Sequence, residues 1–158
     1  MIAVGENAPD FTLPLTEPGT EPAELSLSAL RPGKVVLYFY PKDDTPGCTT
    51  EALDFTRLAA DFAAAGATVV GISKDSPKAH EKFCQKHGLG IKLVSDETGA
   101  TCEAYGTWVE KKMYGKTSMG IQRATFLIDG TGTVVAAWPK VSVKGHAEAV
   151  LEAVRALG

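Results

Sequence analysis

Hydrophobic residues along this chain follow two patterns, continuous runs that predict buried strands and spaced positions that predict helices with one buried face. The runs at residues 34–40 and 67–72 are rich in β-branched and aromatic residues, so each predicts a central strand. After the first run, apolar residues recur every three or four positions and predict one amphipathic helix that ends at Gly66. After the second run, Ser76 and Pro77 open a helix that is predicted to end at residues 87–88.

The second half of the chain predicts an antiparallel addition to this βαβα arrangement. The runs at residues 124–128 and 133–138 flank Asp129-Gly130-Thr131-Gly132, a sequence typical of a hairpin turn. The remaining predicted elements are an extended ribbon at 9–30, a short strand at 93–94, a short helix at 99–105, a loop at 115–120 and a closing helix at 145–157. Together they predict one α/β domain over residues 1–158 with a thioredoxin-like fold, in which helices flank a central mixed β-sheet with an N-terminal β extension.

Composition and charge narrow the possible functions. The net charge of −3, without a cluster of Lys and Arg, argues against a nucleic-acid partner. The apolar runs are too short or too interrupted to span a membrane, and the first residues lack the pattern of a secretion signal, so we expect a cytoplasmic location. Three cysteines in such a chain indicate catalysis or metal binding rather than a framework of disulfides.

Cys48 is the strongest candidate for chemistry, because it lies just beyond the carboxyl end of the first central strand. With Thr45 as the N-cap and Pro46 as the first helical residue, Cys48 becomes the third residue of a helix. Free backbone N–H groups and the helix dipole stabilise a thiolate there, which predicts a redox-active nucleophile. A dithiol of the thioredoxin type would need a second cysteine three positions away, and Glu51 occupies that position.

The segment at residues 41–51, Pro-Lys-Asp-Asp-Thr-Pro-Gly-Cys-Thr-Thr-Glu, resembles the active-site segment of the peroxiredoxins. The similarity is to the bacterioferritin comigratory protein or peroxiredoxin Q group, and it continues at residues 8–11, 71–73 and 123–129. The resemblance implies a monomeric thiol peroxidase of antioxidant defence that reduces hydrogen peroxide and alkyl hydroperoxides without a metal or other cofactor.

The resemblance also implies a role for each matching residue. Cys48 is expected to be the peroxidatic cysteine, and Arg123 the cation that holds its thiolate and the substrate. Thr45 is expected to hydrogen-bond the peroxide, Pro41 to shield the pocket, and Glu51 to orient the arginine. These residue types suit thiolate attack on a peroxide, which needs a cation beside the sulfur and donors to the oxygens.

The cysteine that resolves the oxidised Cys48 is less directly implied. Many members of this group carry it five positions after the peroxidatic cysteine, where this chain has Leu53. Another subset carries it at the position of Cys84, so the resemblance implies a Cys48–Cys84 disulfide that thioredoxin or a glutaredoxin-like protein reduces. Cysteines on separate helices bond only when their Cα atoms approach to about 4.4–6.8 Å, so we expect partial unwinding around both.

Several alternatives remain open. Cys102 or an external thiol could resolve the sulfenic acid, although Cys102 is expected to be a packed small residue. The protein could also be a one-cysteine peroxidase or a redox sensor. A metal-binding module is suggested by the spacing of His80, Cys84 and His87 on one helical face, although solvated helix histidines are the simpler interpretation.

Overall fold

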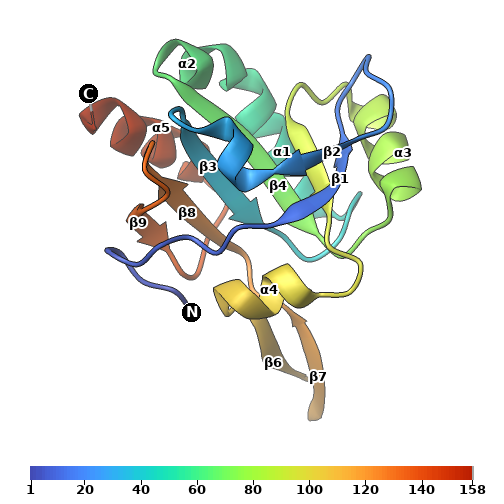
Figure 1. The fold of residues 1–158 in the computed structure, drawn as a ribbon. Coiled ribbons are helices and arrows are strands. Elements are labelled where there is room, and N and C mark those ends of the chain that lie inside the picture. Colours follow the sequence, from blue (N-terminus) through green and yellow to red (C-terminus); the bar gives the residue numbers. More distant parts are fainter. Residues whose placement is uncertain (158) are drawn as a thin grey trace.

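A mixed seven-stranded sheet forms the centre of the computed structural model, which describes residues 1–157 (Figure 1). Its strands are β1 (Thr12–Thr16), β2 (Ala23–Ser26), β3 (Lys34–Phe39), β4 (Ala67–Ser73), β5 (Lys92–Ser95), β8 (Ala124–Ile128) and β9 (Val134–Trp138). They lie in the order β2-β1-β5-β4-β3-β8-β9, with β3, β4 and β5 parallel and the outer pairs antiparallel. The predicted central strands, the C-terminal hairpin and the N-terminal β extension are confirmed.

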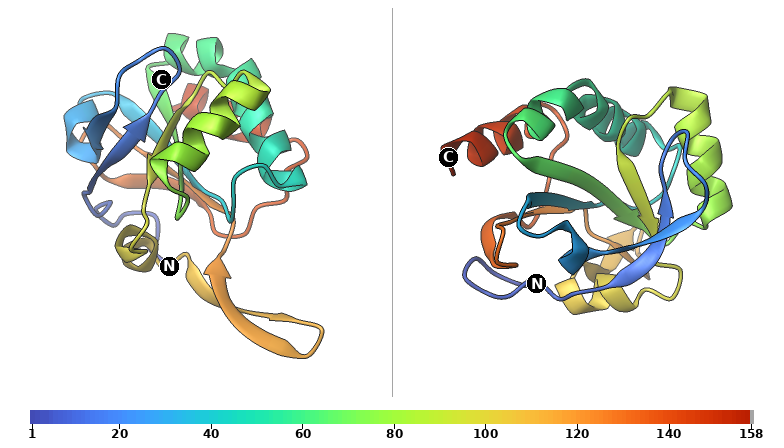
Figure 2. Two further views of the ribbon diagram at one scale, coloured as in Figure 1. Left: turned by 90° about the vertical axis from the view of Figure 1, so that its right-hand side faces the viewer. Right: turned by 45° about the horizontal axis from the view of Figure 1, so that its top comes forward.

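Helices cover both faces of this sheet, as the sequence predicts (Figure 2). One face packs against four helices, α1 (Pro46–Arg57), α2 (Ala59–Ala64), α3 (Pro77–His87) and α5 (His146–Ala156). The opposite face packs against the N-terminal segment, the short helix η1 (Leu27–Leu30) and α4 (Ala100–Tyr105). The thioredoxin-like α/β architecture is therefore confirmed.

Two apolar clusters lie on the two faces of the sheet, and β3 supplies both. Its alternate side chains point to opposite faces, so Tyr38 belongs to the cluster under α1 and α3, while Leu37 belongs to the cluster under α4. Cys48 and Cys84 lie in the first cluster, and Cys102 lies in the second. The sheet thus separates Cys102 from the other two cysteines.

Two predicted elements are wrong in detail. The predicted loop at residues 115–120 is instead part of β7 (Lys116–Ile121), which pairs with β6 (Trp108–Met113) in a hairpin that projects from the domain (Figure 1). Most side chains of this hairpin are exposed, so it has no alternating buried face that a sequence pattern could reveal. The single helix predicted to end at Gly66 is interrupted at Leu58, which separates α1 from α2.

Among residues 1–157, no helix is both long and apolar enough to cross a bilayer.

Candidate active site at Cys48

The turn after β3 places Cys48 at the start of α1. Thr45 is the N-cap, Pro46 is the first helical residue and Cys48 is the third, as the sequence predicts. The Thr45 hydroxyl does not cap the helix but donates to the Lys42 carbonyl at 2.9 Å, which leaves its lone pairs free to accept. Pro41 lies partly buried where this turn leaves β3. Cys48 itself is only 1% exposed, so its sulfur sits among protein groups rather than in bulk water.

Arg123 meets Cys48 because of the strand register. Ala124 pairs with Phe39 across β8 and β3, so the residue before Ala124 lies beside the end of β3 and the turn that follows. From there the Arg123 guanidinium donates from Nη2 to Cys48 Sγ at 3.3 Å and from Nη1 to Glu51 Oε1 at 2.7 Å. A Cβ at Gly47 would lie 3.1 Å from Arg123 Nη2, so the glycine gives the guanidinium room to reach the sulfur.

Burial and charge set the protonation of the groups around this sulfur. Burial raises the pKa of Glu51 to about 7, although the charge of Arg123 opposes the increase. Glu51 Oε2 has no hydrogen-bond partner within residues 1–157, which fits a carboxyl group that is protonated near neutral pH. Burial alone would lower the pKa of Arg123, but the charges of Glu51 and Cys48 outweigh it and raise that pKa. Arg123 is therefore a permanent cation at the thiol.

A second cation, Lys111, lies close to this arrangement. Its ammonium group donates to the carbonyl of Ile121, two residues before Arg123. Burial and the nearby charge of Arg123 lower the pKa of Lys111. Sequence reasoning missed this residue because the strand that carries it, β6, was not predicted.

The two other cysteines occupy different surroundings. Cys84 lies on α3 in the same apolar cluster as Cys48, and burial together with the charge of Asp43 raises its pKa to about 11. Cys102 lies on the opposite face of the sheet, where burial and the Asp96 carboxylate raise the pKa of its thiol strongly. All three cysteines are free thiols. The structure therefore brings Cys84, and not Cys102, to the side of the sheet that holds Cys48.

A buried polar network connects the Cys48 turn to α3. Asp43 Oδ2 and His80 Nδ1 lie 2.6 Å apart, His80 Nε2 donates to the Val94 carbonyl at 3.0 Å, and the Tyr40 hydroxyl donates to Asp43 Oδ1 at 2.6 Å. Asp75 joins this network by accepting from the Asp43 backbone N–H at 2.9 Å. The sequence did not reveal the network, because its members come from four separate segments.

The network also changes the interpretation of the histidines on α3. His80 is fully buried, so the expectation of a solvated histidine is wrong for this residue. Its two ring nitrogens contact Asp43 and Val94, and His87 Nε2 donates to Asp44 at 2.8 Å, so the rings turn to hydrogen-bond partners rather than to Cys84. One group within residues 1–157 has the spacing of metal ligands, Asp43, Asp75 and His80, and hydrogen bonds connect its members to the turn and to β4.

Comparison with known proteins identifies the relatives of this chain. Residues 4–137 match the AhpC/TSA family. A putative peroxiredoxin bcp of Coxiella burnetii is 52% identical over 95% of this chain and 97% of its own length. Peroxiredoxin Bcp of Bacillus subtilis is 43% identical over 98% of this chain and 96% of its own length.

Solved structures agree with these sequence relatives. A structure of Xanthomonas campestris peroxiredoxin Q has a TM-score of 0.85 and 50% identity, over 92% of this chain and 90% of its own. A mutant of Xylella fastidiosa PrxQ has a TM-score of 0.90 and 41% identity, over 99% of this chain and 98% of its own. A structure of the Xanthomonas campestris bacterioferritin comigratory protein that concerns alkyl peroxide reduction has a TM-score of 0.85 and 48% identity, over 93% of this chain and 91% of its own.

Proposed function

The chain belongs to the AhpC/TSA family and is a thiol peroxidase of its Bcp peroxiredoxin group, and we propose that Cys48 reacts with the peroxide while Cys84 resolves the product. The observation that carries the assignment of Cys48 is the contact of 3.3 Å between its sulfur and Arg123 Nη2. A buried cation that also binds Glu51 stabilises a thiolate at the start of a helix, where the dipole acts in the same direction.

The reaction follows from these positions. The Cys48 thiolate attacks one peroxide oxygen, the O–O bond breaks, and the other oxygen leaves as hydroxide or alkoxide that takes up a proton. Negative charge moves from the sulfur to the departing oxygen, so Arg123 and the backbone N–H of Cys48 serve as donors beside the reacting atoms. We assign the Thr45 hydroxyl to a hydrogen bond with the peroxide, Pro41 to shielding the sulfur, and Glu51 to orienting Arg123. The product is a sulfenic acid on Cys48.

The substrates are hydroperoxides, as for the peroxiredoxin relatives. We propose both hydrogen peroxide and alkyl hydroperoxides for this chain. The second class is supported by the Xanthomonas campestris bacterioferritin comigratory protein, whose structures concern alkyl peroxide reduction.

Cys84 is the proposed resolving residue because it shares the apolar cluster of Cys48, whereas the sheet separates Cys102 from both. Its thiol attacks the sulfenic sulfur, a disulfide forms, and the sulfenic oxygen leaves as water. Cys48 and Cys84 begin on different helices, so the first turn of α1, and part of α3, must unwind for the sulfurs to bond.

A thiol reductant completes the cycle, and we propose thioredoxin, or a glutaredoxin-like protein, for this step. Because both reacting cysteines belong to one chain, the cycle needs no second subunit, and we propose a monomer. Three free thiols and a thiol reductant suit a reducing compartment, so we propose that the enzyme works in the cytoplasm.

The test is peroxide consumption with thioredoxin as the electron donor. Cys48→Ser is expected to abolish turnover, and Cys84→Ser is expected to oxidise once and then stop, because its sulfenic acid has no intramolecular partner. Cys102→Ser is the matched control and is expected to turn over like the wild type. Full turnover by Cys48→Ser would refute the peroxidatic assignment, and full turnover by Cys84→Ser would favour a one-cysteine cycle with an external thiol.

A further inference from the structure

Lys111 places a second positive charge near Cys48 and has no carboxylate partner. It lies on β6, opposite Ser118, and its side chain is half-buried. No ion pair within residues 1–157 includes Lys111, and its ammonium group donates instead to the carbonyl of Ile121. A cation that is partly withdrawn from water and bound by a neutral group is unfavourable unless a negative charge lies near it.

The glycine at position 120 gives the lysine room to reach that carbonyl. Gly120 pairs with Val109, so it lies diagonal to Lys111 on the same face of the β6–β7 hairpin. A Cβ at Gly120 would lie 3.1 Å from Lys111 Cδ, 3.3 Å from Cε and 3.6 Å from Nζ. The lysine side chain therefore runs through space that a larger residue would fill, toward the end of β7 that leads to Arg123.

We propose that Lys111 is a positioning residue for the peroxide reaction, whose charge acts with that of Arg123 to keep Cys48 ionised. The inference rests on the proposed function, because it requires Cys48 to be the peroxidatic residue. Lys111 binds the carbonyl two residues before Arg123, and the Arg123 guanidinium contacts Cys48 Sγ at 3.3 Å. Burial and the charge of Arg123 lower the pKa of Lys111, whereas the charge of Cys48 opposes them, so the ammonium group lies within electrostatic range of the sulfur.

The other groups around the sulfur leave the thiolate as the main negative charge. Glu51 binds Arg123, but burial raises its pKa to about 7, so its carboxyl group is partly neutral near neutral pH. Tyr38 shares the apolar cluster of Cys48, and burial raises the pKa of its hydroxyl, which stays neutral. With Arg123 and Lys111 both positive, the site is most stable when Cys48 itself carries a negative charge.

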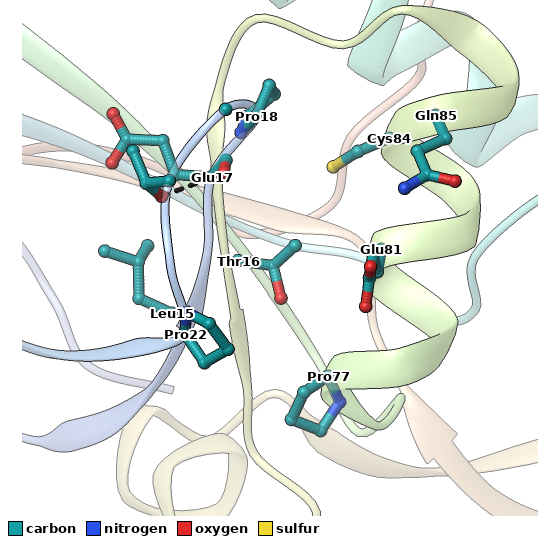
Figure 3. Close-up of a pocket in the computed structure, with 11 residues that line it drawn as sticks. Leu15, Thr16, Glu17, Pro18, Pro22, Pro77, Glu81, Cys84 and Gln85 are labelled. Carbon is teal, nitrogen blue, oxygen red and sulfur yellow. Dashed lines mark hydrogen bonds between the residues drawn. The ribbon is translucent and has the colours of Figure 1, made fainter.

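Cys84 has no cation of this kind beside it. Figure 3 shows its sulfur in the wall of a groove between α3 and the connection from β1 to β2. The described residues that line this groove include two acidic side chains, Glu17 and Glu81, and no lysine or arginine. Burial and the charge of Asp43 raise the pKa of Cys84 to about 11. The effect of Lys111 is therefore expected on Cys48 and not on Cys84.

The charge of Lys111 acts on the thiolate fraction rather than on the bound peroxide. Only the thiolate attacks, so at low pH the rate is proportional to the fraction of Cys48 that is ionised. At high pH this thiol is fully ionised with or without the lysine, and the rate reaches the same plateau. Lys111 is thus expected to extend the activity of the enzyme to lower pH.

The first experiment measures how the reactivity of Cys48 in the reduced full-length enzyme depends on pH. Its rate constants with hydrogen peroxide and with iodoacetamide are determined at a series of pH values, and peptide mass spectrometry assigns each modification to Cys48. Lys111→Met is expected to move the acidic side of both profiles upward by about one pH unit, about a tenfold loss of rate there, and to keep the plateau. Lys112→Met is the matched control, because Lys112 is exposed on the opposite face of the hairpin, and it should follow the wild type.

Two outcomes of this experiment would overturn the inference and leave the proposed function intact. One is a profile of Lys111→Met that coincides with the wild type, and the other is an equal loss of rate at every pH, which would indicate a structural role. A Cys48→Ser variant that still consumes peroxide would instead overturn the proposed function, and this inference with it.

The second experiment keeps the inference testable if Lys111→Met does not fold. Lys111→Arg retains the charge and is expected to show the wild-type profile. Gly120→Val puts side-chain carbons where the lysine lies, 3.1 Å from its Cδ, and is expected to move the acidic side of the profile in the same direction as Lys111→Met. An acidic shift of about one pH unit in Lys111→Arg, or a wild-type profile in Gly120→Val, would overturn the inference.

Discussion

Asp43 and His80 join the turn before Cys48 to the helix that carries Cys84, with 2.6 Å between Oδ2 and Nδ1. His80 Nε2 faces the carbonyl of Val94, which only accepts, so this nitrogen carries a proton and the second proton of the pair lies between Nδ1 and Oδ2. Both residues are buried, and the pair therefore holds the turn before Cys48 against the helix that carries Cys84.

Removing one partner of the Asp43–His80 pair is expected to destabilise the folded protein. Asp43→Ala leaves His80 and the Tyr40 hydroxyl without their acceptor and is expected to lower the free energy of unfolding by about 3–5 kcal/mol. Asp43→Asn can accept from Tyr40 and donate to a neutral His80, so it is expected to cost much less. Urea titration measures both, and hydrogen exchange should show lost protection of α3 in the alanine variant. Equal stability of the two variants would contradict this role.

Arg123 is expected to be the most sensitive residue after Cys48. Arg123→Met removes the donor to Cys48 Sγ and is expected to lower kcat/KM for hydrogen peroxide about a hundredfold or more. Arg123→Lys keeps the charge but cannot bind Glu51 and Cys48 through two parallel donors, so it is expected to recover only part of the activity. Arg155→Met, at a half-exposed position on α5, is the control and should leave kcat/KM unchanged.

The fold could be predicted because the local sequence of each central element fits only one kind of secondary structure. The apolar run that becomes β3 is buried on both faces, and the turn at residues 129–132 is typical of a hairpin, so neither element had a strong alternative. The β6–β7 hairpin lacked such a pattern, since Met113, Tyr114 and Met119 all face solvent.

The site was only partly predictable for a different reason. The position of Cys48 at the start of α1 is determined by local sequence, but its contact with Arg123 spans 75 residues and depends on the register of β3 and β8. The same holds for His80, whose local sequence resembles an exposed helix. Its burial follows from a partner 37 residues away, Asp43, which no local pattern connects to it.

The hydroxyl of Tyr38 is expected to contribute nothing to stability. It is buried without a hydrogen-bond partner in the described part of the chain, while its ring stacks on Phe55 with centroids 4.7 Å apart. Tyr38→Phe keeps the stacking and removes the unpaired group, so the free energy of unfolding should stay constant or rise by about 1 kcal/mol. Tyr40→Phe is the matched comparison, because it loses the bond to Asp43 and should cost about 1–3 kcal/mol. A larger loss for Tyr38→Phe than for Tyr40→Phe would refute this expectation.

Glu51 is expected to make the protein less stable as the pH rises. Burial raises its pKa from 4.5 to about 7, so the folded state binds a proton over this range that the unfolded state has released. The contribution of the protonated Glu51 to the free energy of unfolding is fully present below about pH 4.5. It is lost as the pH rises through about 7, which lowers the free energy of unfolding by about 3 kcal/mol. Glu51→Gln cannot titrate, so its stability relative to the wild type should increase over that range. A constant difference between the two proteins would show that burial does not shift this carboxyl.

His146 is expected to have the opposite effect on the pH dependence of stability, because it makes the protein less stable as the pH falls. Burial, and then the charge of Arg123, lower its pKa from 6.5 to about 4, while its Nε2 lies 2.8 Å from the Thr125 hydroxyl. Its contribution is present above about pH 6.5 and is lost as the pH falls toward 4, again by about 3 kcal/mol. His146→Gln should therefore gain stability relative to the wild type on acidification, the reverse of Glu51→Gln.

Between about pH 4.5 and 6.5 these two contributions have opposite slopes, so they should nearly cancel in the wild type. Urea titrations of the wild type, the single variants and the double variant from about pH 4 to 8 measure the balance. In each single variant, the free energy of unfolding is expected to change with pH as the remaining titratable residue dictates. In the double variant, the contribution of these two positions to the free energy of unfolding should again be independent of pH. A steep wild-type profile with unchanged slopes in the variants would mean that other groups control the pH dependence. Cancellation would instead keep the protein folded with nearly constant stability across mildly acidic pH, including the Cys48 site, where Glu51 binds Arg123 and the charge of Arg123 acts on His146.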